Sequence, residues 1–228
     1  MRNILVIGNT GLVGSGISTY FNEIEDVELK TIDLSEDFDL TDRKSIQDFF
    51  KRNNRIQYIV NCSGLNDHVE NKKNEKNLMK TDLEFLDKYY EINVKAVCFL
   101  VEEAFQILPD ICSLVNFSSL YGKRSPYHPI YNDPKSLSYT ITKHALEGIT
   151  KYYAGFYGNK GLRINSVRIG GINSNQPKKF REWFISRTPL GRLAEVNDLY
   201  GAVDFLSSEE SRYITGQSIT VDGGYTIW

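Results

Sequence analysis

The chain has 228 residues, of which 27 are Lys or Arg and 29 are Asp or Glu, so its formal charge is −2. This length suits one domain with a substantial core, and the near-neutral charge argues against a protein that binds nucleic acid through a basic face. The longest apolar run, residues 96–101, is far shorter than the roughly 18 residues of a membrane span. The three cysteines form neither an even disulfide framework nor a CxxC metal motif. Because no signal peptide precedes the first apolar run, we expect one domain over residues 1–228 in the cytoplasm, with no nucleic-acid or membrane partner.

Apolar runs alternate with helical patterns along the whole chain. Continuous apolar runs predict strands at residues 3–7, 27–32, 58–61, 114–117, 163–168 and 218–221. Helical spacing predicts helices at 11–22, from Thr41 and Asp42 onward, and at 83–108, 138–157 and 195–207. This order predicts an α/β fold in which a parallel sheet carries helices on both faces.

Two stretches interrupt the alternation. Residues 66–82 are polar and rich in lysine, which predicts a solvated surface excursion, with a phosphate-binding flap as the alternative. Residues 120–136 contain three prolines and several aromatic side chains. We expect a substrate-contacting loop there, over about 120–137, and a second one over about 169–190.

A glycine loop joins the first strand to the first helix. Gly8, Gly11 and Gly14 allow a sharp turn and a close approach of the backbone to a pyrophosphate at the helix N-terminus. Asp33 ends the second strand, where a carboxylate accepts hydrogen bonds from ribose hydroxyls. The pattern predicts a doubly wound, Rossmann-type sheet that binds a dinucleotide; tight packing without a ligand is the alternative. Because Asp33 would repel a 2′-phosphate and no Arg directly follows it, NAD(H) is favoured, with NADP(H) as the other possibility.

Tyr139 and Lys143 lie four residues apart, one turn along a predicted helix. An ammonium group beside a phenol favours the ionised phenol, which can then exchange a proton with an alcohol or a ketone. Tyr131 and Lys135 have the same spacing, but Pro134 between them would disrupt a shared helix. The pair at 139 and 143 is therefore the candidate for chemistry, with Ser136 or Ser138 as the helix cap.

Seven landmarks follow one another from Gly8 to Gly224: the glycine loop, Asn61-Cys62-Ser63-Gly64, Asn93, Asn116-Phe117-Ser118-Ser119, Tyr139-x-x-x-Lys143, the strand around Asn165, and Gly216 to Gly224. In this order they resemble the short-chain dehydrogenase/reductase family. The resemblance implies an NAD(P)-dependent oxidoreductase with the catalytic set Asn93, Ser119, Tyr139 and Lys143. In that set Tyr139 moves the hydroxyl proton, and Lys143 lowers its pKa and binds the nicotinamide ribose. Ser119 bonds the substrate oxygen, and Asn93 holds a relay water.

The resemblance also implies the binding residues. Cofactor contacts are expected at Gly8, Asn9, Thr10, Gly11, Leu12, Val13, Gly14, Asp33, Asp39, Leu40, Asn61, Cys62, Ser63, Gly64, Asn93, Tyr139, Lys143, Gly170 and Ile172. Substrate contacts are expected at Ser119, Tyr121, Tyr131 and Gly171. The three histidines are scattered, so no metal site is expected.

Three departures from the family pattern stand out. Only six positions separate Asp33 from Asp39, where the standard branch inserts a helix, so we expect the helix between strands two and three to be shortened or missing. Ser119 and Tyr139 lie 20 positions apart, farther than is standard, which enlarges the substrate loop. Ile169-Gly170 replaces the usual Pro-Gly on the nicotinamide side.

Within the family, stretches in residues 113–228 look most like oxidoreductases of bacterial flagellin-glycan and surface-polysaccharide biosynthesis. We therefore expect hydride transfer between nicotinamide and a hydroxyl or keto carbon of a sugar, sugar phosphate or nucleotide sugar, for which the polar segment 173–181 would suit hydroxyls and phosphates. A reductase of 3-ketoacyl or lipid carbonyls and a non-catalytic dinucleotide-binding regulator are the alternatives. Family members commonly pair through their two long helices, so a homodimer or homotetramer through about 83–108 and 138–157 is expected.

Overall fold

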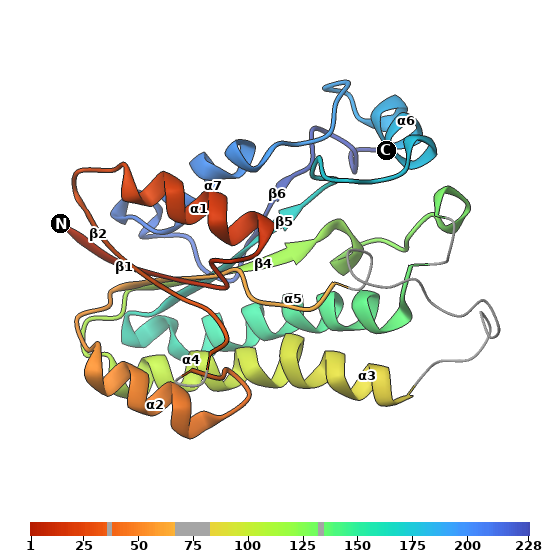
Figure 1. Ribbon diagram of the computed structural model, residues 1–228. Coiled ribbons are helices and arrows are strands. Elements are labelled where there is room, and N and C mark those ends of the chain that lie inside the picture. Colours follow the sequence, from red (N-terminus) through yellow and green to blue (C-terminus); the bar gives the residue numbers. More distant parts are fainter. Residues whose placement is uncertain (36–37, 67–82, 132–134) are drawn as a thin grey trace.

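The computed structural model describes residues 1–35, 38–66, 83–131 and 135–228. Six parallel strands form one sheet in the order β2-β1-β3-β4-β5-β6 (Figure 1). The strands are β1 (Arg2–Ile7), β2 (Val27–Ile32), β3 (Tyr58–Asn61), β4 (Ser113–Ser119), β5 (Arg163–Ile169) and β6 (Ser218–Val221). The sheet confirms the parallel α/β fold, because each apolar run identified in the sequence forms one of these strands.

Helices cover both faces of the sheet (Figure 1). One face carries α1 (Leu12–Asn22) and α7 (Tyr200–Leu206), and the other carries α2 (Arg43–Arg52), α4 (Ala96–Ile107) and α5 (Leu137–Tyr157). The remaining helices are α3 (Leu83–Tyr90), which continues into α4 through a π-helical turn (Glu91–Lys95), and α6 (Lys178–Arg187). Helix α6 was not predicted, because its residues were interpreted as part of a substrate loop.

The two faces of β1 show why the sheet is buried on both sides. Alternate residues of a strand point to opposite faces. Leu5 and Ile7 accordingly pack in the core under α2, α4 and α5, whereas Ile4 and Val6 pack in the core under α1 and α7. All four side chains are buried, which explains why the strand is written as an unbroken apolar run.

The connection from β2 to β3 is short, as the spacing of Asp33 and Asp39 predicts. Among the described residues between these two aspartates there is no helix, and Ser35 and Phe38 pair through an isolated antiparallel bridge. The connection's own helix, α2, begins only at Arg43, with the Asp42 carboxylate accepting a hydrogen bond from the Lys44 amide. The helix that was expected to be missing is therefore one that would precede α2.

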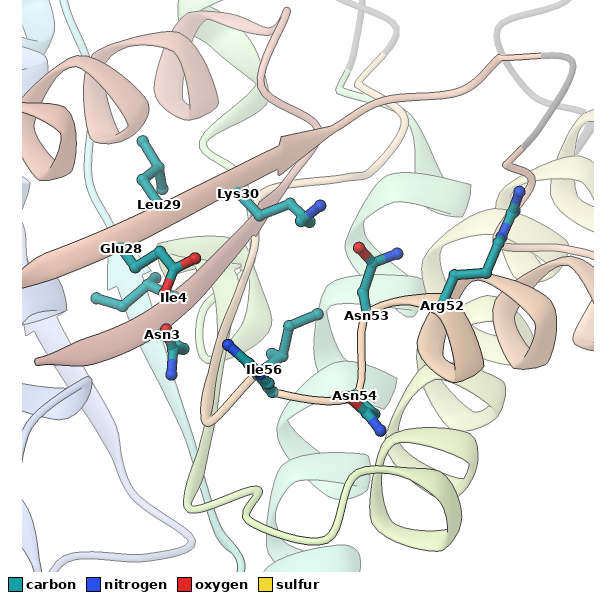
Figure 2. Close-up of a pocket in the computed structure, with 10 residues that line it drawn as sticks. Asn3, Ile4, Glu28, Leu29, Lys30, Arg52, Asn53, Asn54 and Ile56 are labelled. Atoms are coloured by element: carbon teal, nitrogen blue, oxygen red, sulfur yellow. The ribbon is translucent and has the colours of Figure 1, made fainter.

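The edge strand β2 has three exposed residues, Glu28, Lys30 and Thr31. A hollow of about 230 Å³ lies there, between β2 and the residues that follow α2 (Figure 2). Its walls include Glu28 and Lys30 on the strand and Asn53 and Asn54 across the gap. It begins near the amino ends of the strands, whereas ligands of doubly wound sheets bind at the carboxyl ends.

Gly14 offers a test of how tightly the first strand, loop and helix are packed. A Cβ at this position would lie 2.0 Å from the carbonyl oxygen of Gly8, a contact that the backbone cannot relieve without moving. We expect Gly14→Ala to lower the free energy of unfolding by about 1–3 kcal/mol, the usual cost of overpacking. Thermal or urea unfolding followed by circular dichroism measures the change.

Gly155→Ala is the matched control, because Gly155 lies in α5 and a Cβ there meets nothing within 4 Å. This control should be neutral or stabilise by up to about 1 kcal/mol through helix propensity. Equal stability of Gly14→Ala and the wild type would contradict the packing argument.

Candidate active site

The glycine loop is shaped to bring the backbone close to a ligand. Gly8 has φ +80°, and a Cβ there would lie 2.8 Å from the amide nitrogen of Ser63. Gly11 caps α1 with no side-chain hydrogen bond, and the first turn of that helix holds no acidic residue. The amide groups at the start of α1 are thus not blocked by a carboxylate, so this loop fits the pyrophosphate of a dinucleotide.

The side chains of the predicted loop are less uniform than its backbone. Leu12 is exposed, whereas Val13 packs against the core that lies under α1. Asn9 is half-buried and Thr10 is exposed. The loop therefore offers mainly its backbone to a ligand.

Asp33 is tied to this loop. Its carboxylate accepts hydrogen bonds from the amide and the hydroxyl of Thr10 and from the amide of Leu34. Partial burial opposes ionisation, but these hydrogen bonds outweigh it and lower the pKa of Asp33. A charged carboxylate therefore stands at the end of β2, beside the loop, as the sequence predicts.

Asp39 and Leu40 are used mainly inside the fold. The Asp39 carboxylate accepts hydrogen bonds of 2.8 Å from both the amide and the hydroxyl of Thr41, and Leu40 packs against the core under α2. The Asp39 amide donates to the Ser45 hydroxyl. These contacts close the turn before α2, so a contact of Asp39 with adenine stays a prediction.

Residues 61–64 carry the chain from β3 toward the catalytic residues. Asn61 donates to the Asn116 side chain on the neighbouring strand β4 and accepts from the amide and hydroxyl of Ser63. Gly64 has φ +154°, and a Cβ there would lie 3.2 Å from Oδ1 of Asn93 and 3.8 Å from Nζ of Lys143. Gly64 is therefore the point where residues from three separate parts of the chain converge.

Asn93 organises this convergence from the π-helical turn. Its side chain, 4% exposed, accepts from the Leu65 amide at 2.7 Å and donates to the Leu65 carbonyl at 3.2 Å. It also donates to the Thr142 hydroxyl on α5 at 3.3 Å. The sequence identified Asn93 but neither the π-helical turn, a feature often found at functional sites, nor the role of Thr142.

Lys143 lies in the same buried region. Its ammonium group donates to the Phe117 carbonyl of β4 at 2.8 Å. Burial penalises the charged form and lowers the pKa of Lys143 to about 8. Burial also raises the pKa of the Cys62 thiol, so this cysteine is an uncharged side chain beside Lys143.

Tyr139 and Ser119 complete the predicted catalytic set. Tyr139 lies in the first turn of α5, which Ser136 caps, and its side chain is 8% exposed. The Nζ atoms of Lys143 and Lys135 lie 5.7 Å and 4.0 Å from the centroid of its ring. Ser119, the last residue of β4, accepts a hydrogen bond from the Tyr121 amide. The structure thus brings Asn93, Tyr139 and Lys143 together and places Ser119 at the same edge of the sheet.

Ser118, the neighbour of Ser119, serves a different purpose. It donates to the buried Glu147 carboxylate at 2.7 Å, which also binds the Arg168 guanidinium and the Ser218 hydroxyl. Burial opposes ionisation of Glu147, but these donors outweigh it and lower its pKa. This network ties α5 to β4, β5 and β6, and it was not identified from the sequence because its members are far apart in the chain.

An aromatic wall adjoins Tyr139 on the predicted substrate side. It comprises side chains from the loop after β4, from α6 and from the C-terminal segment, namely Tyr121, Ile130, Tyr131, Phe180, Phe184 and Tyr225. The hydroxyls of Tyr121 and Tyr131 share a hydrogen bond, and Tyr225 stacks on Phe184 with ring centroids 4.2 Å apart. Both predicted substrate tyrosines thus lie in this wall, while Lys178, Lys179 and Arg181 of α6 are exposed.

The loop that is predicted to lie on the nicotinamide side follows β5. A Cβ on Gly170 would lie 2.8 Å from Asp222, and one on Gly171 would lie 2.8 Å from the Phe184 ring. Ile172 pairs with Ala194 through an isolated bridge. A hollow of about 210 Å³ opens beside Gly171, between α6 and the segment after β6.

The remaining predictions concern residues outside the described ranges, metal sites and membrane-spanning helices. Residues 67–82, interpreted as a surface excursion or flap, lie outside the described residues, as do 132–134. In the described part of the chain, no cluster of three His, Cys, Asp or Glu side chains is arranged to hold a metal ion. Within the same residues, no helix has the length and apolarity needed to cross a membrane.

Comparisons with known proteins give the family. A family model described as enoyl-(acyl carrier protein) reductase matches residues 21–226. The chain is 30% identical over 198 residues to a 3-oxoacyl-(acyl-carrier-protein) reductase of Thermotoga maritima, covering 82% of this chain and 75% of the relative. It is also 30% identical to gluconate 5-dehydrogenase of Gluconobacter oxydans over 206 residues, covering 83% and 73%.

A solved structure agrees with these relatives. A short-chain dehydrogenase from Leptospira borgpetersenii with bound NAD+ superposes with a TM-score of 0.84 at 29% identity, covering 99% of this chain and 93% of that one. The family model and the relatives each span most of the chain, which carries the glycine loop and the Tyr139-Lys143 pair in one fold. The chain therefore belongs to the short-chain dehydrogenase/reductase family and is an NAD(P)-dependent oxidoreductase.

Proposed function

We propose that Tyr139 is the proton donor and acceptor in the interconversion of a hydroxyl and a keto group. The observation that carries this proposal is the position of the Tyr139 ring. Nζ of Lys143 lies 5.7 Å from its centroid, and the Asn93 side chain donates a hydrogen bond to the hydroxyl of Thr142, which also lies on α5. When bound, the nicotinamide cofactor supplies or takes up the hydride. The protein's own residues then have to hold the substrate oxygen and move one proton.

Each catalytic residue has a separate task in this proposal. Lys143, held by the Phe117 carbonyl, is positively charged below about pH 8 and stabilises the ionised phenol of Tyr139. Ser119 donates a hydrogen bond to the same substrate oxygen, which stabilises the charge that develops on it. Asn93 fixes the segment around Gly64 and holds the relay water, and its links to Leu65 and Thr142 support this role.

NAD(H) is the proposed cofactor. The glycine loop fits a pyrophosphate, and the charged Asp33 beside Thr10 suits the hydroxyls of an adenosine ribose. A 2′-phosphate at that place would meet like charge. The solved relative with bound NAD+ is consistent with this choice, although another structural neighbour, at 23% identity, holds NADP.

A carbohydrate is the proposed substrate class. The aromatic wall combines rings with the hydroxyls of Tyr121 and Tyr131, and this combination of groups would suit a sugar ring. Gluconate 5-dehydrogenase among the relatives supports the same class. A role in flagellin-glycan or surface-polysaccharide synthesis rests on the sequence resemblance alone, and the lysines of α6 are exposed.

A 3-ketoacyl or other lipid carbonyl is the second candidate. The same wall is largely apolar, and both the matching family model and the Thermotoga relative are described as acyl-carrier-protein reductases. A regulator without catalytic activity is less well supported, because the whole catalytic set is present in the chain.

A cytoplasmic homodimer or homotetramer completes the proposal. The three cysteines are free thiols, as is usual in the reducing cytoplasm. On α5, Leu137, Ile141, Tyr152 and Phe156 are exposed apolar side chains of the predicted pairing helix. A patch of this kind usually marks an interface.

Tyr139→Phe tests the proton transfer. We expect kcat to fall by about 10²–10⁴, the usual contribution of a general acid or base, while the affinity for NADH measured by fluorescence stays within a factor of about two. Rates are followed by NADH and NADPH absorbance with gluconate and other polyols, their keto forms, and acetoacetyl thioesters. Turnover of polyols or keto sugars supports the first substrate class, and turnover of thioesters alone supports the second.

Tyr213→Phe is the matched control, because it removes a hydroxyl from a fully exposed ring and should leave turnover unchanged. Normal turnover by Tyr139→Phe would end the proposed mechanism.

Asp33→Asn tests the cofactor preference. Removing the negative charge should move the ratio of NADH to NADPH affinity toward NADPH by at least about tenfold, the factor that about 1.4 kcal/mol gives. Titration of the wild type and the variant with both cofactors measures the ratio. Thr10→Val, which removes the hydroxyl partner but keeps the carboxylate, should preserve the preference. A wild type that binds NADPH more tightly would overturn the proposal for NAD(H).

Tyr152→Glu combined with Phe156→Glu tests the interface on α5. These rings are 66% and 53% exposed, and charges there should convert the assembly into monomers by light scattering. Tyr213→Glu, at a fully exposed ring elsewhere, should leave the mass unchanged. A wild type that is monomeric at micromolar concentration would refute the interface.

A further inference from the structure

A second lysine contacts the ring of Tyr139. Lys135 is only 5% exposed, and its Nζ lies 4.0 Å from the centroid of the Tyr139 ring, closer than Nζ of Lys143. The same ammonium donates to Oδ1 of Asn66 at 2.6 Å. A buried cation over an aromatic face is held more strongly than an exposed one, because water does not compete for it.

This contact does not arise from helical spacing. Helix α5 begins at Leu137, with Ser136 as its cap, so Lys135 precedes the helix and reaches Tyr139 from the loop. Lys143, by contrast, meets the ring from within α5 and is anchored on the Phe117 carbonyl. Two ammonium groups from different elements therefore lie within 6 Å of one ring centroid.

The anchor of Lys135 belongs to the catalytic architecture. Asn66 directly follows Leu65, whose backbone is fixed by Asn93. The clamp that places Gly64 beside Lys143 thus also places Asn66 beside Lys135. Asn93 therefore fixes the segment that holds Lys135, whereas Lys143 is held by the Phe117 carbonyl.

The titratable groups that share the hydrophobic cluster of the ring, together with the one that lies beside Lys143, are phenols and a thiol. The phenols that share its cluster are Tyr89, Tyr121, Tyr131 and Tyr225, and the thiol is that of Cys62, beside Lys143. Burial raises the pKa of Tyr121, of Tyr131 and of Cys62, so these groups are neutral near pH 7. Lys135 and Lys143 are therefore the cations that the described structure places against this ring.

We propose that Lys135 is a positioning residue that acts through Tyr139, stabilising its ionised phenol together with Lys143. The inference rests on the proposed role of Tyr139 in proton transfer. In the direction of alcohol oxidation, the ionised phenol takes the hydroxyl proton of the substrate, and in the direction of reduction the neutral phenol returns it. A second cation lowers the pH at which half of the Tyr139 phenol is ionised.

A spectroscopic titration tests the proposal without any substrate. The absorbance of ionised tyrosine is followed against pH in each protein and in the same protein carrying Tyr139→Phe, and the difference reports Tyr139 alone. Lys135→Met should raise the midpoint of that difference by about one pH unit, the low end of the shift that a nearby charge produces. Lys135→Arg, which keeps the charge, should restore most of the wild-type midpoint.

Two further variants keep the test decisive. Lys123→Met, at an exposed lysine of the same loop, should leave the midpoint unchanged. Asn66→Ala, which removes the anchor but not the charge, should shift the midpoint in the same direction by less than Lys135→Met does, and it serves if Lys135→Met does not fold. An unmoved midpoint in the folded Lys135 or Asn66 variant would overturn the proposal.

The pH profile of turnover separates this proposal from the proposed function. In the direction of oxidation kcat/KM rises with pH as Tyr139 ionises, so Lys135→Met should move that rise to higher pH by the same amount as the titration midpoint. If Tyr139→Phe retains turnover, the proposed function fails while the titration still decides whether Lys135 acts on Tyr139. If Tyr139→Phe is inactive and the Lys135→Met midpoint is unmoved, only the role of Lys135 fails.

Discussion

The side chain of Asn93 pairs with both backbone groups of Leu65, and the arrangement of the site depends on this pairing. Buried backbone groups need hydrogen-bond partners, and the segment that leaves β3 has no neighbouring strand to supply them at Leu65. A single amide can supply both, because it has an acceptor oxygen and a donor nitrogen. The pairing fixes where the chain runs after β3, and through Thr142 it fixes that segment against α5.

This clamp brings a glycine and an amide residue close to the two lysines. A Cβ on Gly64 would lie 3.2 Å from Oδ1 of Asn93, so the Asn93 side chain would have to move by a few tenths of an ångström to make room. Two residues later, Asn66 is in position to hold Lys135. The clamp therefore places the surroundings of both ammonium groups, while α5 supplies Tyr139 and Lys143 and the loop before it supplies Lys135.

The strands could be predicted from the sequence, and the candidate catalytic residues could be identified in it, because their signals are local. A strand buried on both faces is an unbroken apolar run, and Tyr139-x-x-x-Lys143 is a pattern within one helix. Lys135 was set aside because Pro134 rules out a helix shared with Tyr131, which is correct, but its contact with Tyr139 is made through space from a loop. The network around Glu147 joins four elements and has no sequence spacing to reveal it.

Helix α6 was missed for a different reason. Phe180, Trp183 and Phe184 have the i, i+3, i+4 spacing of a helix, but they follow Pro177 in a polar stretch that was interpreted as a substrate loop. In the structure Pro177 is the N-cap of α6, and both phenylalanine rings are buried in the aromatic wall.

The predicted substrate side has contacts that are independent of Asn93 and Lys143, although it shares the ring of Tyr139. Tyr225 stacks on Phe184, and the Arg124 guanidinium binds the carbonyls of Thr226 and Trp228, so the C-terminal segment is fixed to α6 and to the loop after β4. None of these contacts involves Asn93 or Lys143. Asn93 and Lys143 are held by other contacts, whereas the ring of Tyr139 packs in the same cluster as the wall. A change in the shape of α6 or of the C-terminal segment would therefore reach Tyr139 through this cluster without touching the hydrogen bonds of Asn93 and Lys143.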